Sequence, residues 1–360
     1  MRFFSVASIA AVGAMLMCLS GLSSANPVSS SSRLVARAPG GSDAPVIDKE
    51  YPYGETKFFT AFATYRGNSG FIKCPTEAKL LRAEHDALEA IHRSPARKHG
   101  MSESVKSLFV KLHGIVNYNG LNCVMTERLE GSDLYDYARG LSQAQKNEQL
   151  PVIFMQVITA LKYMHRIGWA HGDIKPENIF ITLDSPNGPP KVKLIDFDMS
   201  VPVCYWQSGL LGGTYGYRAP EEFLGGTIDH IARDSWALGA TMYASMMGMP
   251  PYGFTQNPRT GVYEPWGNGV MESKMLMVYA EKKAGLRPMG DLQNAALVEL
   301  VNTLMTVDPK VRPKINDLDN ILLEKLANHK SIYEKVMELW KTLATTYSNL
   351  PRCMPETAFS

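Results

Sequence analysis

Residues 171–178 carry side chains whose types and spacing suit phosphoryl transfer. The segment reads His-Gly-Asp-Ile-Lys-Pro-Glu-Asn, and an Asp-Phe-Asp tripeptide begins at Asp196. Moving a phosphoryl group requires a divalent cation at the phosphate oxygens, another positive charge near the moving group and an acceptor for a hydroxyl proton. Asp173 suits the proton acceptor and Lys175 the positive charge, whereas Asn178 and Asp196 offer the hard oxygen atoms that Mg²⁺ prefers. The sequence therefore predicts a phosphotransferase site rather than a polar turn between two strands.

Three further motifs follow these residues in a fixed order. Residues 213–221 end in Ala-Pro-Glu, residues 234–239 read Asp-Ser-Trp-Ala-Leu-Gly, and residues 308–313 read Asp-Pro-Lys-Val-Arg-Pro. With these motifs the chain resembles the eukaryotic protein kinases over about residues 50 to 325. The resemblance implies a substrate-docking loop, a buried central helix in the large lobe, and a late arginine that pairs with Glu221.

The resemblance also implies a bilobal α+β fold of the protein-kinase type. The small β-rich lobe is expected at residues 49–131 and the larger helical lobe at 132–350, followed by a tail at 351–360. At 360 residues, with 45% hydrophobic and 20% charged residues, the chain has the composition of a globular protein with a substantial core. Thirty-seven basic and 35 acidic residues leave a net charge of +2, so the composition implies no nucleic-acid partner.

The N-terminal residues have the features of a secretory signal. A short basic start precedes an apolar run from Phe3 to Leu22, and small residues lead to a cleavage point after Ala25. The run is rich in Ala, Ser and Gly, whereas a stable span needs about 20 strongly apolar residues. A signal at 1–25 is therefore favoured over a membrane anchor or a mitochondrial presequence. We expect an exported protein with no stable membrane span after signal removal, either extracellular or delivered into another cell.

Two features of the exported chain follow from its composition. Residues 26–48 contain a serine run, Ala-Pro pairs and a Gly-Gly pair, which predicts a flexible linker. An oxidising export route would make disulfides possible, and the four cysteines outside the signal allow three pairings. Cys74 and Cys123 fall on strands that would be neighbours in a kinase small lobe, but unpaired buried thiols are the favoured interpretation. The other two cysteines are Cys204 and Cys353.

The nucleotide loop of the small lobe departs from the family pattern. The resemblance aligns it with the segment that starts at Gly54, the one glycine kept there, whereas Thr56 and Phe59 occupy the other two glycine positions. Side chains at those positions would narrow the approach of the backbone to phosphate. Phe71 replaces the small residue that covers adenine in the family. Either the small Ala61, which stands where valine is usual, compensates for its volume, or Phe71 excludes the nucleotide.

Lys73 is the residue that the resemblance assigns to the α- and β-phosphates of ATP. Its partner in the family is a glutamate on the following helix, which apolar spacing predicts over residues 76–91. Glu84 is the favoured partner, and Glu77 and Glu89 are rivals on the same helix.

Residues 124–134 resemble the last strand of the small lobe and the hinge to the large lobe. The resemblance makes Thr126 the gatekeeper and implies that backbone groups of Glu127 to Leu129 face adenine. It also implies that Asp133 could reach a ribose hydroxyl.

A helix and a hairpin are expected to position the large-lobe residues. Apolar spacing predicts a core-facing helix over 150–167, and strands at 179–181 and 192–195 flank a turn-rich loop. This hairpin is expected to present the acidic and amide side chains to one cleft. They are Asp173, Asn178 and Asp196.

Two departures from the family pattern affect the large-lobe site. Gly172 stands where, in the family, an arginine often precedes the catalytic aspartate. A phosphate on Ser200, Tyr205 or Ser208 would therefore lack that partner. Loop phosphorylation is therefore predicted not to be the main on-switch. Asp198 replaces the glycine of Asp-Phe-Gly, and this added carboxylate beside Asp196 could bind a second metal or repel phosphate.

The favoured function is the Mg²⁺-dependent transfer of the ATP γ-phosphate to a serine or threonine of a protein substrate. Lys175 is typical of the serine/threonine-specific members of the family that the chain resembles. One alternative is a secreted pseudokinase that acts as a protein-binding module, which the altered nucleotide loop suggests. Another is a small-molecule kinase similar to aminoglycoside and choline phosphotransferases, but these generally lack the equivalent of Lys175 and the Ala-Pro-Glu loop.

Overall fold

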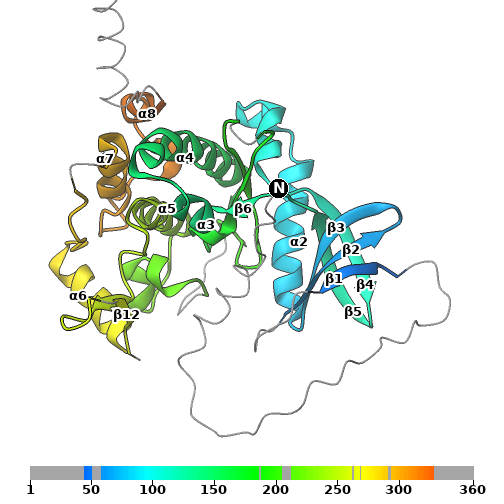
Figure 1. Ribbon diagram of the computed structural model, residues 1–360, viewed down its shortest axis with the longest axis horizontal. Helices are drawn as coiled ribbons and strands as arrows, with labels where there is room; N and C mark the ends of the chain where they lie inside the picture. The colour runs from blue at the N-terminus through cyan, green and yellow to red at the C-terminus, as the bar shows by residue number, and fades with distance from the viewer. Residues whose placement is uncertain are drawn as a thin grey trace, which may run out of the picture.

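The computed structural model divides the chain into a small β-rich lobe and a larger helical lobe, as predicted (Figure 1). It describes residues 44–50, 58–185, 188–204, 212–261, 263–267, 269–290 and 293–327. The predicted signal and the C-terminal tail lie outside these ranges. Within them, no helix combines the length and the apolar character needed to cross a membrane.

An antiparallel sheet of five strands builds the small lobe, in the order β1-β2-β3-β5-β4. A tight turn joins β2 to β3, and both of its residues, Arg66 and Gly67, have positive φ, as a type I′ hairpin requires. Strand β1 pairs with β2 and starts at Val46, so the predicted end of the linker at residue 48 was wrong by a few residues. The strands are β1 (Val46–Glu50), β2 (Phe58–Tyr65), β3 (Asn68–Pro75), β4 (Leu112–Tyr118) and β5 (Leu121–Glu127).

The alternation of side chains gives this sheet two distinct faces. Ala61 pairs with Ile72, and both belong to the buried apolar cluster on one face. Phe62 pairs with Phe71 on the other face, which also carries Lys73. The prediction that Ala61 lies beside Phe71 was therefore wrong, because a difference of one residue in a strand moves a side chain to the opposite face.

A disulfide joins Cys74 on β3 to Cys123 on β5, with their Cα atoms 4.0 Å apart. Unpaired thiols had been the favoured expectation, and the structure corrects it. The bond lies within the buried apolar cluster and links the two strands one residue after Lys73. Cys204 is exposed and unpaired among the described residues, and Cys353 lies outside them.

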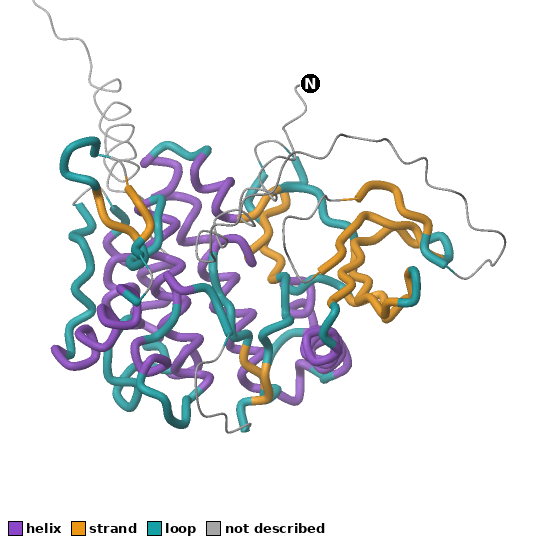
Figure 2. Tube along the Cα trace, turned by 90° about the horizontal axis from the view of Figure 1, so that it is seen from below, coloured by secondary structure: helices purple, strands orange, loops and turns teal. Residues whose placement is uncertain are grey.

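Helix α2 (Ala78–Arg93) packs against the small-lobe sheet (Figures 1 and 2). It starts two residues after Thr76, and its N-cap residue Glu77 makes no side-chain capping bond. Its buried residues recur at helical spacing and share one face. They are Glu84, Ala87, Leu88 and Ile91. The same periodicity that buries the apolar residues thus turns Glu84 toward the sheet.

Two long helices form the core of the large lobe. Helix α4 (Gln143–Arg166) starts earlier than predicted, because Ser142 and Gln145 form a capping box that lets the helix begin in a polar stretch. Helix α5 (His230–Met247) is buried along nearly its whole length and is the predicted central helix. Figure 2 shows these helices gathered on the side of the molecule away from the small-lobe sheet.

A hairpin of β8 (Ile179–Thr182) and β9 (Lys191–Leu194) lies where the sequence predicts it, and β6 (Ser132–Asp133) adds a third strand. The remaining strands are short pairs. They are β7 (Trp169–Ala170) with β10 (Val201–Pro202), and β11 (Phe254–Gln256) with β12 (Tyr263–Pro265). The other α-helices of the described residues are α3 (Leu134–Arg139), α6 (Val270–Glu281), α7 (Ala295–Leu304) and α8 (Asn320–Ala327). The 3₁₀ turns are Ala96–His99, Glu103–Leu108, Pro176–Asn178, Tyr215–Tyr217, Pro220–Phe223 and Ile315–Asp317.

Candidate active site

The loop of residues 171–178 is anchored on the central helix through Asp234. This carboxylate is 0% exposed and accepts the backbone N–H of His171 at 2.8 Å and that of Gly172 at 2.9 Å. It also lies 2.9 Å from Nε2 of His165 on helix α4. Because a buried carboxylate needs such partners, the contacts fix the loop relative to both core helices.

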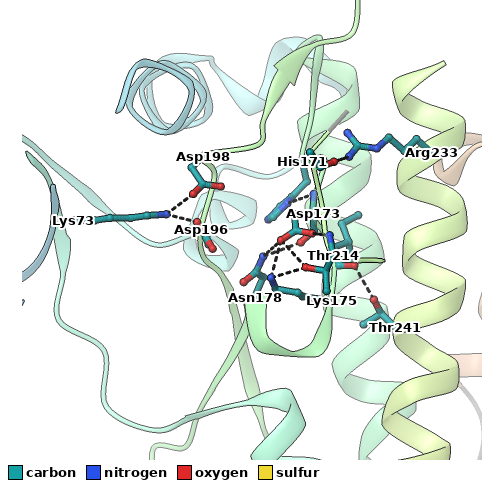
Figure 3. Close-up of polar contacts among 12 residues, drawn as sticks. Lys73, His171, Asp173, Lys175, Asn178, Asp196, Asp198, Thr214, Arg233 and Thr241 are labelled. Carbon is teal, nitrogen blue, oxygen red and sulfur yellow. Dashed lines mark hydrogen bonds and ion pairs between the residues drawn. The ribbon is translucent and has the colours of Figure 1, made fainter. Parts of the chain in front are cut away.

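Asp173 lies at the centre of a polar cluster (Figure 3). Its Oδ2 accepts from Nζ of Lys175 at 2.8 Å, and its Oδ1 accepts from the backbone N–H of Thr214 at 2.8 Å. The Thr214 hydroxyl lies 3.3 Å from Oδ2 and also accepts from Lys175 at 2.8 Å. Burial disfavours the charged form, but Lys175 lowers the pKa of Asp173 below its ordinary value. The carboxylate is therefore ionised at neutral pH and can accept a proton.

Asn178 and Asp196 come together because the hairpin joins their segments. The backbone N–H of Ile195 donates to the carbonyl of Asn178 at 3.1 Å, next to the pairing of β8 with β9. Asn178 donates through Nδ2 to the carbonyl of Asp173 at 2.8 Å. Its side-chain oxygen is then the atom that remains for a cation.

Asp196 has an unusual backbone conformation for a residue other than glycine. Its φ is +64°, in the left-handed region that costs free energy and is concentrated at functional sites. The following Phe197 is fully buried, and its ring lies 4.9 Å from the ring of His171. Despite burial, Lys73 and Lys175 lower the pKa of Asp196 to about 2. This carboxylate is therefore held as an anion.

The donor set around Asp196 suits Mg²⁺ bound together with phosphate oxygens. Among the residues that the structure describes, no group of three His, Cys, Asp or Glu side chains could hold a metal ion. Mg²⁺ is commonly held by one or two protein oxygen ligands, with substrate phosphates and water completing its shell. Asn178 and Asp196 fit that arrangement.

Lys73 reaches this cluster from strand β3. Its Nζ lies 2.5 Å from Oδ1 of Asp196, 2.9 Å from Oδ2 of Asp198 and 3.5 Å from Oε2 of Glu84. Burial disfavours the ammonium, but Asp196, Glu84 and Asp198 together raise the pKa of Lys73 well above its ordinary value. The lysine is therefore charged and is surrounded by three carboxylates.

Glu84, the predicted partner of Lys73, is the acidic residue of helix α2 that faces the site. It is buried, which raises its pKa, and it is in ion-pair range of Lys73. The rival Glu77 pairs with Lys79 at 2.9 Å, and the rival Glu89 pairs with Arg93 at 3.0 Å. Of the three acidic residues that the sequence offered on this helix, Glu84 is therefore the one that lies in ion-pair range of Lys73.

Asp198 contacts Lys73 directly, which the sequence alone had not indicated. Burial and the adjacent Asp196 raise the pKa of Asp198 to about 7, although Lys73 opposes this shift. Its side chain is only 9% exposed. Asp198 therefore pairs with the ammonium group of Lys73, and a phosphate that binds this group would have to compete with it.

Aromatic rings lie beside Lys73 on the face of the sheet that carries it. The rings of Phe62 and Phe71 are 5.8 Å apart, edge to face, and Phe71 pairs with Thr126 in the ladder. The guanidinium of Arg128 lies 4.3 Å over the Phe62 ring. Both phenylalanines are half-buried. Two large rings thus stand where the resemblance implied one valine and one small residue over adenine.

The altered nucleotide loop is only partly described. Gly54 and Thr56 lie outside the described residues. Phe59 belongs to strand β2, and its ring stacks on Tyr118 at 5.1 Å, within the cluster on the face opposite Lys73. The expectation that the Phe59 side chain narrows the phosphate approach was therefore wrong.

The hinge residues make more side-chain contacts than the resemblance implied. The backbone N–H of Glu127 donates to the carbonyl of Lys111 at 2.9 Å, and its carboxylate lies 2.5 Å from Nζ of Lys193. Leu129 is half-buried against the large-lobe core. Asp133, a candidate for ribose, instead caps helix α3 by accepting the backbone N–H of Asp136 at 2.9 Å.

The late arginine of the sequence pattern pairs with the Ala-Pro-Glu glutamate as predicted. Arg312 donates from Nη1 to Oε1 of Glu221 at 2.6 Å and from Nη2 to Oε2 at 2.9 Å. Arg312 is buried, so this bidentate pair fixes the end of the substrate loop to the large lobe.

Comparisons with known proteins agree with this geometry. The protein kinase domain model matches residues 83–323. Sperm motility kinase 2B of Mus musculus is 26% identical over 260 residues, which cover 70% of this chain and 49% of that protein. Maternal embryonic leucine zipper kinase of Danio rerio is 26% identical over 268 residues, which cover 70% of this chain and 36% of that protein. The chain spans about half or less of the length of these relatives. Since the domain model matches more than half of the chain, the chain belongs to the protein kinase family.

Proposed function

We propose that this chain is an active protein kinase that transfers the γ-phosphate of ATP to serine or threonine hydroxyls. The observation that carries the proposal is the set of contacts at Asp173. An ionised carboxylate is held there by Lys175 and by both the backbone and the hydroxyl of Thr214. Such an arrangement orients a proton acceptor at the edge of the substrate loop, which is what transfer to a hydroxyl requires.

The other residues take roles that their positions support. Lys175 lies between Asp173 and Thr214, where its charge would stabilise the moving phosphoryl group. Lys73, supported by Glu84, would orient the nucleotide phosphates. Mg²⁺, held by Asn178 and Asp196, would neutralise charge on the phosphate oxygens. The contact of Lys175 with Thr214 also supports serine or threonine as the phosphate acceptor, because Lys175 is typical of the serine/threonine-specific members of the family.

Radiolabel transfer from ATP to a peptide mixture tests the proposal. The purified chain should label serine- or threonine-containing peptides, and Asp173→Asn should lower the rate by about 10²- to 10⁴-fold. The variant should stay folded with a somewhat lower melting temperature, because the amide keeps the shape of the side chain but its single oxygen can accept from only one of Lys175 and the Thr214 N–H. Equal rates for parent and variant would refute the role of Asp173.

A pseudokinase that works as a protein-binding module is the second candidate. The contacts of Lys73 with Asp196 and Asp198 and the two rings beside it favour this alternative, since they occupy the places of phosphate and base. A thermal-shift titration separates the two. ATP with Mg²⁺ should raise the melting temperature of a kinase with the logarithm of the ligand concentration above Kd, whereas a blocked site would give no shift.

We also propose that the chain works outside the reducing cytosol of the cell that makes it. The signal-like sequence of residues 1–25 and the Cys74–Cys123 disulfide support this, because disulfides persist in oxidising compartments. Expression with a C-terminal tag should deliver a chain that begins after Ala25 to the medium. A full-length chain that stays in the cytosol with free thiols would contradict export.

A further inference from the structure

An arginine from helix α5 lies beside Gly172 in the loop of residues 171–178. Its φ is +84°, and a Cβ atom there would lie 2.2 Å from the carbonyl oxygen of Met199. No side chain fits at this position without a shift of the backbone. The same Cβ atom would lie 3.2 Å from Nη1 of Arg233. A guanidinium from helix α5 therefore lies beside the position where the family often has an arginine.

Arg233 is buried, at 4% exposure, and its hydrogen bonds among the described residues are made with permanent groups of the chain. Its Nε donates to Oε2 of Glu222 at 2.9 Å, and its Nη2 donates to the carbonyl of Gly212. Glu222 is 0% exposed and also accepts from Nε of Arg218 at 3.3 Å. The guanidinium thus joins the central helix to the segment that precedes Thr214.

Gly213 shows how closely Arg233 approaches the catalytic carboxylate. A Cβ atom at Gly213 would lie 2.9 Å from Nη2 of Arg233 and 3.6 Å from Oδ1 of Asp173. The next residue, Thr214, donates its backbone N–H to that same Oδ1. Fixing the carbonyl of Gly212 therefore fixes the amide that orients Asp173. Figure 3 shows Arg233 reaching from its helix toward this group of residues.

We infer that Arg233 is a positioning residue that holds the segment 212–214 against the catalytic loop without a phosphate. The inference rests on the proposed function for its catalytic consequence, but the positioning itself does not depend on activity. An arginine that orders a loop through a phosphate needs that modification to be present. Arg233 uses a backbone carbonyl and the buried Glu222, so the segment is held in the unmodified chain.

Hydrogen exchange of the Thr214 amide tests the inference on the phosphatase-treated full chain. Arg233→Met keeps the apolar stem but removes both donors, and Arg233→Lys keeps the charge without the planar pair of donors. We expect exchange in the peptide 212–217 to be at least about tenfold faster in Arg233→Met, with Arg233→Lys intermediate. Amides of helix α7 should keep their protection and serve as the internal reference. Arg139→Gln, at a largely exposed arginine, is the matched control and should match the parent.

Kinetics of the same variants supply a second measurement. Arg233→Met should lower peptide phosphorylation by at least about tenfold, whereas the thermal shift given by ATP and Mg²⁺ should stay as in the parent, since Lys73 and Asp196 are not contacted by Arg233. Unchanged Thr214 exchange in both variants would overturn the inference, as would loss of Thr214 protection in the parent after phosphatase treatment. A parent chain that transfers no phosphate but shows the exchange pattern would contradict the proposed function alone.

Discussion

Lys73 Nζ lies 2.9 Å from Oδ2 of Asp198, closer than its 3.5 Å separation from Oε2 of Glu84. The carboxylates on both sides of Phe197 thus reach the same ammonium group, since Asp196 lies 2.5 Å away. A phosphate oxygen that approaches Lys73 must compete with Asp198. If the phosphate can displace Asp198, the protein is an enzyme with weak nucleotide affinity. If it cannot, the protein is a binding module.

Asp198→Asn should strengthen nucleotide binding. The amide keeps the shape of the side chain but removes the negative charge that holds Lys73, so the ammonium becomes available to phosphate. We expect the KM for ATP to fall by about 3- to 10-fold, equivalent to about 1 kcal/mol. The exposed Asp184→Asn is the control, because its carboxylate contacts only Lys191 among the described residues and should leave the KM unchanged. An Asp198→Asn protein that binds ATP more weakly would indicate that this carboxylate serves the nucleotide.

Phe71→Ala should also improve ATP binding, for a steric reason. Removing the ring opens space next to Thr126 on the face of the sheet that carries Lys73, at a cost of about 1–2 kcal/mol in the free energy of unfolding because the ring is only half-buried. Phe59→Ala is the matched control, since it removes the same ring from the opposite face of the same sheet. Isothermal titration calorimetry with ATP and Mg²⁺ should show a higher affinity for ATP in Phe71→Ala but not in Phe59→Ala. Equal affinities in the two variants would show that Phe71 does not obstruct the base.

Asp133→Asn should change how stability depends on pH. Burial raises the pKa of Asp133 above its ordinary value of about 3.9, so the folded chain holds this proton more tightly than the unfolded chain. The contribution of Asp133 to the free energy of unfolding is therefore greatest at low pH, and it is lost as pH rises through the raised pKa. Asparagine caps the helix without titrating. Urea unfolding from pH 4 to 8 should show the variant gaining stability relative to the parent as pH rises. If the two proteins differed in free energy of unfolding by the same amount across this pH range, the raised pKa of Asp133 would be contradicted.

The large lobe could be predicted well because its motifs consist of residues that are local in sequence. Asp173, Lys175 and Asn178 lie within one turn-rich loop, so their types and offsets already indicated their shared site. The pairing of Arg312 with Glu221 was indicated only by family resemblance, since no local pattern joins residues that far apart. The contact of Arg233 with Gly212 was missed, although Gly172, where the family often has an arginine, marked the place beside which it lies.

The small lobe was harder to predict because strand register decides which face each side chain occupies. Ala61 and Phe59 were assigned to the nucleotide by aligning the segment that starts at Gly54 with the family's nucleotide loop, but the ladder places both on the other face. A hairpin whose turn is one residue longer or shorter reverses every such assignment. The bond between Cys74 and Cys123 depends on the same register, because strands β3 and β5 bring them together across 49 residues of sequence.

Reduction of the Cys74–Cys123 bond should destabilise the small lobe and loosen Lys73. The bond closes a long loop of the unfolded chain, and removing such a cross-link typically costs about 2–4 kcal/mol. Cys74→Ser with Cys123→Ser should therefore lower the melting temperature by several degrees, and dithiothreitol should lower that of the parent but not of the double variant. Cys204→Ser, at an exposed and unpaired cysteine, is the control and should respond to dithiothreitol as the parent does. Lys73 directly precedes Cys74 on the same strand. The double variant should therefore exchange its amides across residues 71–75 faster than the parent does, and helix α5 should show no such increase. If the parent melts at the same temperature with and without dithiothreitol, the cross-link does not support the lobe that carries Lys73.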